Sequence, residues 1–172
     1  MMLRALALAG GVSGAAGLSQ FPEYSQQYTQ RLGGAVDELS RQIVRYERDA
    51  ATVGLTLDGL VTQLGTEGPL SSVQAGNIRA DIARHARLLA DLDALKSAGP
   101  FMRAKLATHL GDRDVARRAL QTFKPAMPVT FEGAVFAGTG FLAGWLGISA
   151  LVAFLAGGFS SLRRLLTPRR RV

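Results

Sequence analysis

Cysteine is absent from the 172 residues of the chain, and histidine occurs only twice. Without thiols the chain can form no disulfide bond, no thiolate nucleophile and no zinc site of the cysteine type, although this absence is compatible with any cellular compartment. The GxSxG-type elbow of serine hydrolases is also missing. No glycine-rich segment has the lysine and the strand-to-helix setting of a phosphate-binding loop. We therefore expect a non-enzymatic protein that holds no cofactor.

Strand-like alternation of apolar and polar residues is equally absent, and no repeat of supersecondary size is present. Residues 22–128 instead carry apolar side chains at helical spacing, in two heptad-like seams. The predicted fold of this region is therefore all-α, either a helical bundle or a coiled-coil hairpin. The first seam comprises Leu32, Val36, Leu39, Ile43, Tyr46 and Ala50, and the second comprises Ile78, Ile82, His85, Leu89 and Leu92.

Helix boundaries within this region can be read from individual residues. Ser71 or Ser72 is the expected N-cap of the helix that carries the second seam, and Asp112 the expected N-cap of a last short helix. Gly33 and Gly34 interrupt the helix of the first seam and cost it about 1 kcal/mol each relative to alanine. We expect this helix either to bend at the two glycines or to cross a neighbour closely there.

Acidic residues are outnumbered, with a net charge of +7 and a pI near 10.8. The excess is not spread along the chain, because residues 19–128 contain 14 Lys and Arg against 12 Asp and Glu. Five of the other basic residues lie in the last ten positions. A nucleic-acid-binding protein would need its basic residues gathered on a folded face, so we do not expect that function.

Charged residues are missing altogether between Glu132 and Arg163, a run of 30 residues. About 20 apolar residues suffice to cross the hydrocarbon core of a bilayer, and the sequence predicts a transmembrane helix over residues 129–162. Thr130 is its expected N-cap. The arginines of the basic tail, residues 163–172, place this end of the chain in the cytoplasm by the positive-inside rule.

The N-terminal segment is shorter and less apolar than the C-terminal one, with Arg4 followed by a convincing apolar stretch over residues 5–18 only. A signal peptide cleaved near Gly17 is one interpretation, since a small-x-small site follows a short apolar core. Gly10 and Gly11 stand where a signal peptide usually has bulky residues, which favours the alternative. We expect a retained transmembrane helix, a signal anchor, over residues 1–21.

Small residues recur every three or four positions in both predicted spans, so each span has one face of small side chains. Such faces allow backbones to approach closely in lipid, and we expect them to pack on each other, on a second copy or on another membrane protein. The stripes consist of Ala7, Gly10, Gly14 and Gly17 in the first span and Gly133, Ala137, Gly140, Gly144 and Gly147 in the second.

Two further groups of residues are candidates for a functional site. Tyr24, Gln27 and Tyr28 hydrogen-bond without carrying charge, which suits either a bilayer interface or a contact with a partner protein. Asp81 and His85 are one helical turn apart, a spacing that can serve a metal if His109 joins them. Basic residues beside the two spans could bind lipid headgroups or only set topology: Arg4, Arg163, Arg164, Arg169, Arg170 and Arg171.

Two blocks, LSQFPEYSQQYTQRLGGAVDEL and KPAMPVTFEGAVFAGTGFLAGW, resemble a family of small proteobacterial membrane proteins known as domain of unknown function 2937. The resemblance extends over nearly the whole chain. It implies a protein of the inner membrane with two spans. It carries no activity, cofactor or functional residue over to this sequence.

The sequence thus predicts two transmembrane helices that flank a helical extramembrane domain over residues 22–128. We expect a bacterial inner-membrane protein with both termini cytoplasmic and the central domain periplasmic. Its expected role is that of an accessory or scaffolding subunit, with membrane lipids and the helices of other membrane proteins, or of itself, as partners. Alternatives are a self-assembling homo-oligomeric envelope protein, and a metal-binding protein or enzyme that uses Asp81, His85 and His109.

Overall fold

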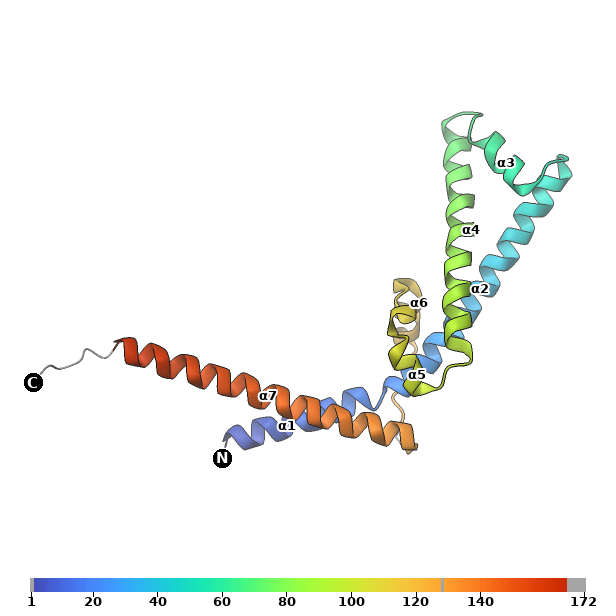
Figure 1. The fold of residues 1–172 in the computed structure, drawn as a ribbon. Helices are drawn as coiled ribbons and strands as arrows, with labels where there is room; N and C mark the ends of the chain where they lie inside the picture. The colour runs from blue at the N-terminus through green and yellow to red at the C-terminus, as the bar shows by residue number, and fades with distance from the viewer. Residues whose placement is uncertain (1, 128, 167–172) are drawn as a thin grey trace, which may run out of the picture. The chain divides into compact units, whose positions relative to one another are not determined.

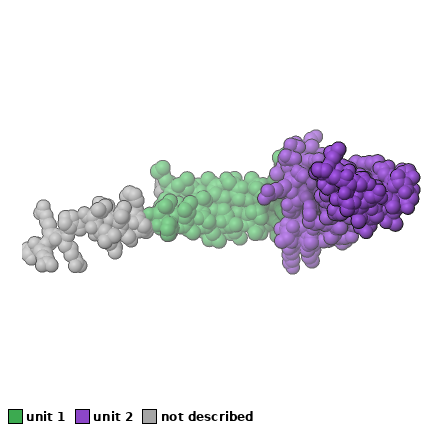
Figure 2. All heavy atoms as spheres, turned by 90° about the horizontal axis from the view of Figure 1, so that it is seen from above, with its two compact units in different colours: residues 1–23, 125–172 green, residues 24–124 purple. Residues whose placement is uncertain are grey.

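The computed structural model describes residues 2–127 and 129–166, with side chains up to Ala156. Every regular element of these residues is helical, which confirms the all-α prediction (Figure 1). The chain divides into two compact units, residues 1–23 with 125–172, and residues 24–124 (Figure 2). The elements are α1 (Met2–Leu18), α2 (Phe21–Thr52), α3 (Leu57–Leu64), α4 (Pro69–Lys96), α5 (Pro100–Lys105), the 3₁₀ helix η1 (Ala107–Leu110), α6 (Arg113–Gln121) and α7 (Phe131–Leu166).

Unit 1 is a pair of helices, α1 and α7, that cross each other (Figure 1). Gly10 lies against Gly144, and Gly14 against Gly140. Residue numbers rise along α1 as they fall along α7, so the helices are antiparallel. Thr130 caps α7 as expected, because its Oγ1 accepts a hydrogen bond from the backbone N–H of Gly133 over 3.1 Å.

Unit 2 is built on two long helices, α2 and α4, which diverge toward the ends that α3 connects (Figure 1). Each connection to α3 contains a glycine with positive φ, Gly54 at 72° and Gly68 at 139°. An L side chain is strained at such angles, which accounts for glycine at both turns. Thr56 caps α3 by accepting from the N–H of Gly59 over 3.1 Å.

The larger core of unit 2 lies where α6 packs on α2 and α4. Its fully buried members include Tyr28 and Leu32 of α2, Leu88 and Leu95 of α4, and Ala119 of α6. A smaller core at the other end joins α3 to α4. The two cores together hold four helices, α2, α3, α4 and α6, and their side chains come from the apolar faces of amphipathic helices.

Between the two cores, α2 and α4 are joined by polar side chains rather than by a continuous apolar seam. Ser40 Oγ lies 2.8 Å from His85 Nε2. Asp81 accepts hydrogen bonds from the Tyr46 hydroxyl and the Gln42 side-chain amide, each over 3.0 Å. An uninterrupted coiled coil would carry apolar residues at these levels. The region is therefore a helical hairpin with a polar middle layer.

Two predictions within unit 2 were wrong in detail. The seam of α4 uses Leu88, which is fully buried, whereas the predicted Leu89 is 38% exposed. A straight α-helix drifts away from a strict heptad by about 20° per repeat, so the buried position changes along a helix of this length. The N-cap is also earlier than Ser71 or Ser72, because Pro69 takes the first helical position, where its missing N–H is not needed.

Candidate functional site

The glycine crossing of unit 1 brings the backbones of α1 and α7 into direct contact. A Cβ atom added at Gly14 would overlap the carbonyl oxygen of Gly140, and one added at Gly144 would overlap that of Gly10. Both helices thus contribute a G-x-x-x-G spacing, Gly10 with Gly14 and Gly140 with Gly144, as in close helix pairs in membranes. A side chain at any of these positions would force the helices apart.

Other members of the two predicted stripes lie at or beyond the edges of this crossing. Ala7 is 6% exposed, Gly133 is buried and Ala137 half-buried. A Cβ at Gly17 or Gly147 would meet nothing within 4 Å, although the adjacent Leu18 and Ile148 lie against the facing helix, so these two glycines face away from the contact. Gly11 was not part of the predicted stripe, but it lies against the ring of Phe141. A Cβ added at Gly11 would be 2.7 Å from Cε2 of that ring.

Both helices of unit 1 are long and apolar enough to belong to membrane spans, one within Met2–Thr52 and one over Phe131–Ala156. Only 6% of the most apolar part of the second span is buried, whereas a core helix of a soluble protein would be mostly buried. Exposed side chains of α7 include Leu142, Leu146 and Phe154. This pattern is typical of a helix that faces lipid.

The predicted contact surface of Tyr24, Gln27 and Tyr28 is largely part of the core of unit 2. Tyr28 is fully buried, and its hydroxyl oxygen accepts from the N–H of Asp112 over 3.0 Å. The ring of Tyr24 lies between those of Tyr28 and Phe123, with centroids 6.3 and 6.2 Å away. Gln27 is half-buried. Tyr28 therefore positions α6 and has no surface left for a partner.

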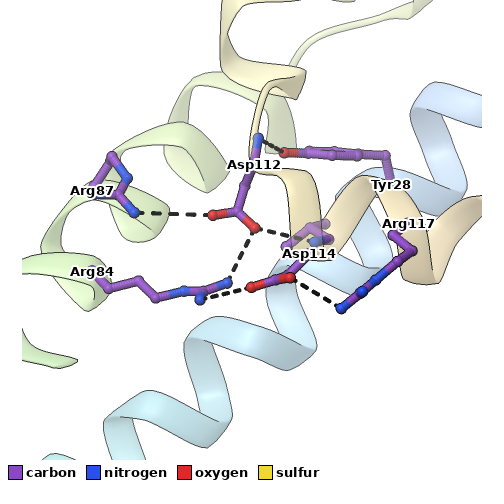
Figure 3. Close-up of polar contacts among 7 residues, drawn as sticks. Tyr28, Arg84, Arg87, Asp112, Asp114 and Arg117 are labelled. Atoms are coloured by element: carbon purple, nitrogen blue, oxygen red, sulfur yellow. Dashed lines mark hydrogen bonds and ion pairs between the residues drawn. The ribbon is translucent and has the colours of Figure 1, made fainter. Parts of the chain in front are cut away.

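A cluster of ion pairs fixes the start of α6 to α4 (Figure 3). The two terminal nitrogens of Arg84 reach Asp112 and Asp114 at 3.1 Å each. Asp112 also caps α6, as predicted, by accepting from the N–H of Val115 over 3.1 Å. Its side chain is only 11% exposed, so the carboxylate is satisfied by the chain itself. These ion pairs hold the start of α6 against α4.

Neighbouring charges and burial shift the pKa of several groups in unit 2. Hydrogen bonding and charge from Arg84 lower the pKa of Asp114 below its ordinary range, and Arg117 adds to the effect. Arg41 lowers the pKa of Glu38 in the same way. Burial raises the pKa of Tyr28, with a further contribution from the charge of Asp112, although the hydrogen bond from the Asp112 backbone opposes both.

The residues considered for a metal site are not brought together. Asp81 accepts hydrogen bonds from Tyr46 and Gln42. His85 is hydrogen-bonded to Ser40. His109 Nδ1 lies 2.7 Å from Oδ1 of Asp91. Over residues 2–127 and 129–166, no three side chains of His, Asp or Glu are grouped so that they could hold a metal ion. The structure thus gives each of the three predicted ligands a different partner.

A groove of about 390 Å³ lies between α2, α4 and α6. Its lining includes Gly34, Ala35 and Leu39 of α2 and Val115 of α6, with arginine side chains beside them. α2 runs continuously from Phe21 to Thr52 through Gly33 and Gly34, and a Cβ added at Gly34 would meet nothing within 4 Å, so no close crossing occurs at that glycine. No sequence pattern could have revealed this groove, since three separate helices form it.

Of the basic residues assigned to headgroups or topology, Arg4 lies in α1 and is exposed. Arg163 and Arg164 fall within α7, beyond the last described side chain. Arg169, Arg170 and Arg171 lie outside the described residues.

Comparison with known proteins assigns the chain to a family. The family model described as "Protein of unknown function (DUF2937)" matches residues 2–161, and the chain belongs to that family. No curated protein and no solved structure matches the chain significantly. The function must therefore be argued from the structure itself.

Proposed function

We propose that this protein is a non-enzymatic membrane scaffold, anchored by α1 and α7 as a helical hairpin and presenting unit 2 outside the bilayer. The observation that carries the proposal is the backbone contact of Gly10 and Gly14 with Gly140 and Gly144. In water the hydrophobic effect drives helices together through large apolar side chains. In lipid that force is absent, and close packing of small residues takes its place.

The exposed surface of α7 supports the same conclusion. Leaving a large apolar side chain in water rather than burying it forgoes roughly 1.5–3 kcal/mol, and α7 exposes several, among them Leu142, Leu151 and Phe154. A bilayer removes this unfavourable exposure without any further protein contact. It also explains why glycines form the contact between α1 and α7, while leucines of both helices, such as Leu6, Leu8, Leu142 and Leu146, are exposed.

The crossing also argues for retention of α1. Cleavage after Gly17 would remove Gly10 and Gly14, and Gly140 and Gly144 would lose the backbone on which they pack. Because α1 and α7 are antiparallel, two full spans would place both ends of the chain on one side. The arginines flanking the spans favour the cytoplasm for that side, with unit 2 in the periplasm of a bacterial inner membrane.

The role of an accessory or scaffolding subunit rests on what unit 2 offers. Both of its histidines, with Asp91, Asp112 and Asp114, are occupied by bonds between helices, which suits a rigid module that holds a position for a partner. The glycine faces are already used within the chain, so partner helices would bind other surfaces. Self-assembly into a homo-oligomer is the alternative, and purification in mild detergent must distinguish it from the accessory role.

Reporter fusions and purification test the proposal. Fusions at either terminus should behave as cytoplasmic, and a fusion at the exposed turn near Gly65 should behave as periplasmic. The chain should remain in the membrane pellet after alkaline carbonate washing. Purification in mild detergent should recover a different protein in constant ratio. Release by carbonate would contradict the anchor, and recovery of the chain alone or only with itself would contradict the accessory role.

A further inference from the structure

We infer that the groove between α2, α4 and α6 is a binding site for a small anion that carries a compact apolar group, with a carboxylate or phosphate as its charged part. This site lies entirely within unit 2, and it is independent of the membrane anchor proposed above. Its volume of about 390 Å³ is within the range of small-molecule sites, about 300–1,000 Å³.

The charge of the groove is determined by which of its ionisable side chains are already paired. Glu38 is paired with Arg41 and Arg45, and Asp114 with Arg84 and Arg117. Asp81 accepts from two neutral donors. The carboxylates that line the groove are therefore satisfied by the chain itself.

Two arginines of the lining, Arg31 and Arg118, are in no close ion pair with a described residue, although the charge of Arg118 also acts on Asp114. Arg31 of α2 donates to the hydroxyl of Thr122 over 2.9 Å. Neither Arg31 nor Arg118 of α6 forms an ion pair with any acidic side chain of the described residues. A guanidinium group binds carboxylates and phosphates through paired N–H donors. An anion in the groove would thus be held by arginines from two helices.

Gly34 is the glycine of α2 that lines the groove. It lies in the interior of a regular helix, where glycine is less favourable than alanine. Its φ is not positive, and a Cβ added there would meet nothing within 4 Å. The apolar wall of the groove continues from Gly34 to Ala35 and Val115. A large side chain at this position would therefore narrow the space open to an apolar group.

Phenyl phosphate is a suitable probe because it joins a phosphate to a compact ring and dissolves in water. The experiment titrates it by calorimetry into the full chain in phosphatidylcholine nanodiscs, with benzyl alcohol as the uncharged comparison. We expect saturable binding of phenyl phosphate and none of benzyl alcohol. Absence of saturable binding to the unaltered chain would overturn the inference.

Three variants locate the site, and two matched controls accompany them. Gly34→Leu fills the groove, and Arg31→Gln and Arg118→Gln each remove one charge, so each should weaken binding by about tenfold or more. Gly76→Leu makes the same change at another exposed helical glycine with nothing within 4 Å, and Arg48→Gln removes a charge from α2 outside the groove. Both controls should bind as the unaltered chain does. Equal affinity of the groove variants and the controls would contradict the assignment.

Nanodiscs with phosphatidylglycerol distinguish two sources of the anion. If a lipid headgroup occupies the groove, the anionic lipid will compete and raise the apparent dissociation constant of phenyl phosphate. If the natural ligand is a soluble anion, the constant will stay the same. Both results support an anion site, and they differ in what fills it.

Discussion

Replacing Gly14 by alanine adds one methyl group at the point where α1 touches the backbone of α7. The added Cβ would overlap the carbonyl oxygen of Gly140 and would lie 3.0 Å from its carbonyl carbon and 3.3 Å from Cα of Gly144. These neighbours are all backbone atoms, so no change of rotamer can relieve the contact. The two helices must instead separate by on the order of 1 Å to restore an ordinary C···O distance.

The size of the effect follows from the atoms that each glycine meets. Overpacking a well-packed contact costs about 1–3 kcal/mol, and Gly14→Ala, Gly140→Ala and Gly144→Ala should fall in this range because each meets backbone. Gly11→Ala should cost less, since its neighbour is the ring of Phe141, which can turn. Gly17→Ala is the matched control in the same stripe, with nothing within 4 Å.

The assay uses the single tryptophan of the chain, Trp145, which lies in α7 next to Gly144. Transfer from mild detergent into increasing dodecyl sulfate should separate the helices, and the fluorescence of Trp145 should report the midpoint. We expect the midpoint to fall for the three backbone-contact variants and to stay unchanged for Gly17→Ala. Equal midpoints for Gly14→Ala, Gly140→Ala and Gly17→Ala would refute the close backbone crossing.

Three further predictions concern unit 2 and can be checked by urea unfolding followed by circular dichroism. Tyr28→Phe should lower the free energy of unfolding by about 1–3 kcal/mol, because the N–H of Asp112 loses its acceptor, whereas Tyr24→Phe should change it little. Asp112→Ala should destabilise by about 0.5–2 kcal/mol through loss of the α6 cap, and Asp112→Asn, which keeps a capping oxygen, should cost less. Asp114 and Glu38 have folded pKa values below their ordinary 3.8 and 4.5, so their stabilisation is complete above those values and is lost as pH falls further. The free energy of unfolding should therefore be constant near neutral pH and fall below about pH 4. The fall should be smaller in a Glu38→Gln/Asp114→Asn variant. An equal fall in both proteins would contradict the ion-pair assignment.

Local rules predicted those parts of the fold that depend on neighbouring residues. The caps at Asp112 and Thr130 need only an acceptor side chain at the start of a helix. The small-residue spacing pointed to Gly10, Gly14, Gly140 and Gly144, which meet at the crossing. Periodicity defines a face, however, and it does not say how far two helices stay in contact. Gly17 and Gly147 belong to the predicted stripes but face away from the contact, in which the adjacent Leu18 and Ile148 take part.

Tertiary arrangement decided the features that the sequence did not reveal. Tyr28 looked like an exposed polar aromatic, because nothing in its neighbourhood shows that α6, more than 80 residues later, covers it. Leu88 and Leu89 are equally apolar, and only the docking of α6 and α2 selects the first. The groove beside Gly34 likewise requires three helices at once. Such features are set by contacts between distant segments and leave no periodic signal.

Cysteine crosslinking in membranes tests the antiparallel hairpin most directly, because the chain has no cysteine of its own. The pair Gly11→Cys and Phe141→Cys faces across the crossing, while Gly17→Cys with Gly147→Cys is the control pair, whose members lie away from the contact on opposite sides of it. A short thiol crosslinker should join the first pair within one chain and leave the control pair unjoined. Products formed only between two chains, or equal reaction of both pairs, would contradict the intramolecular hairpin.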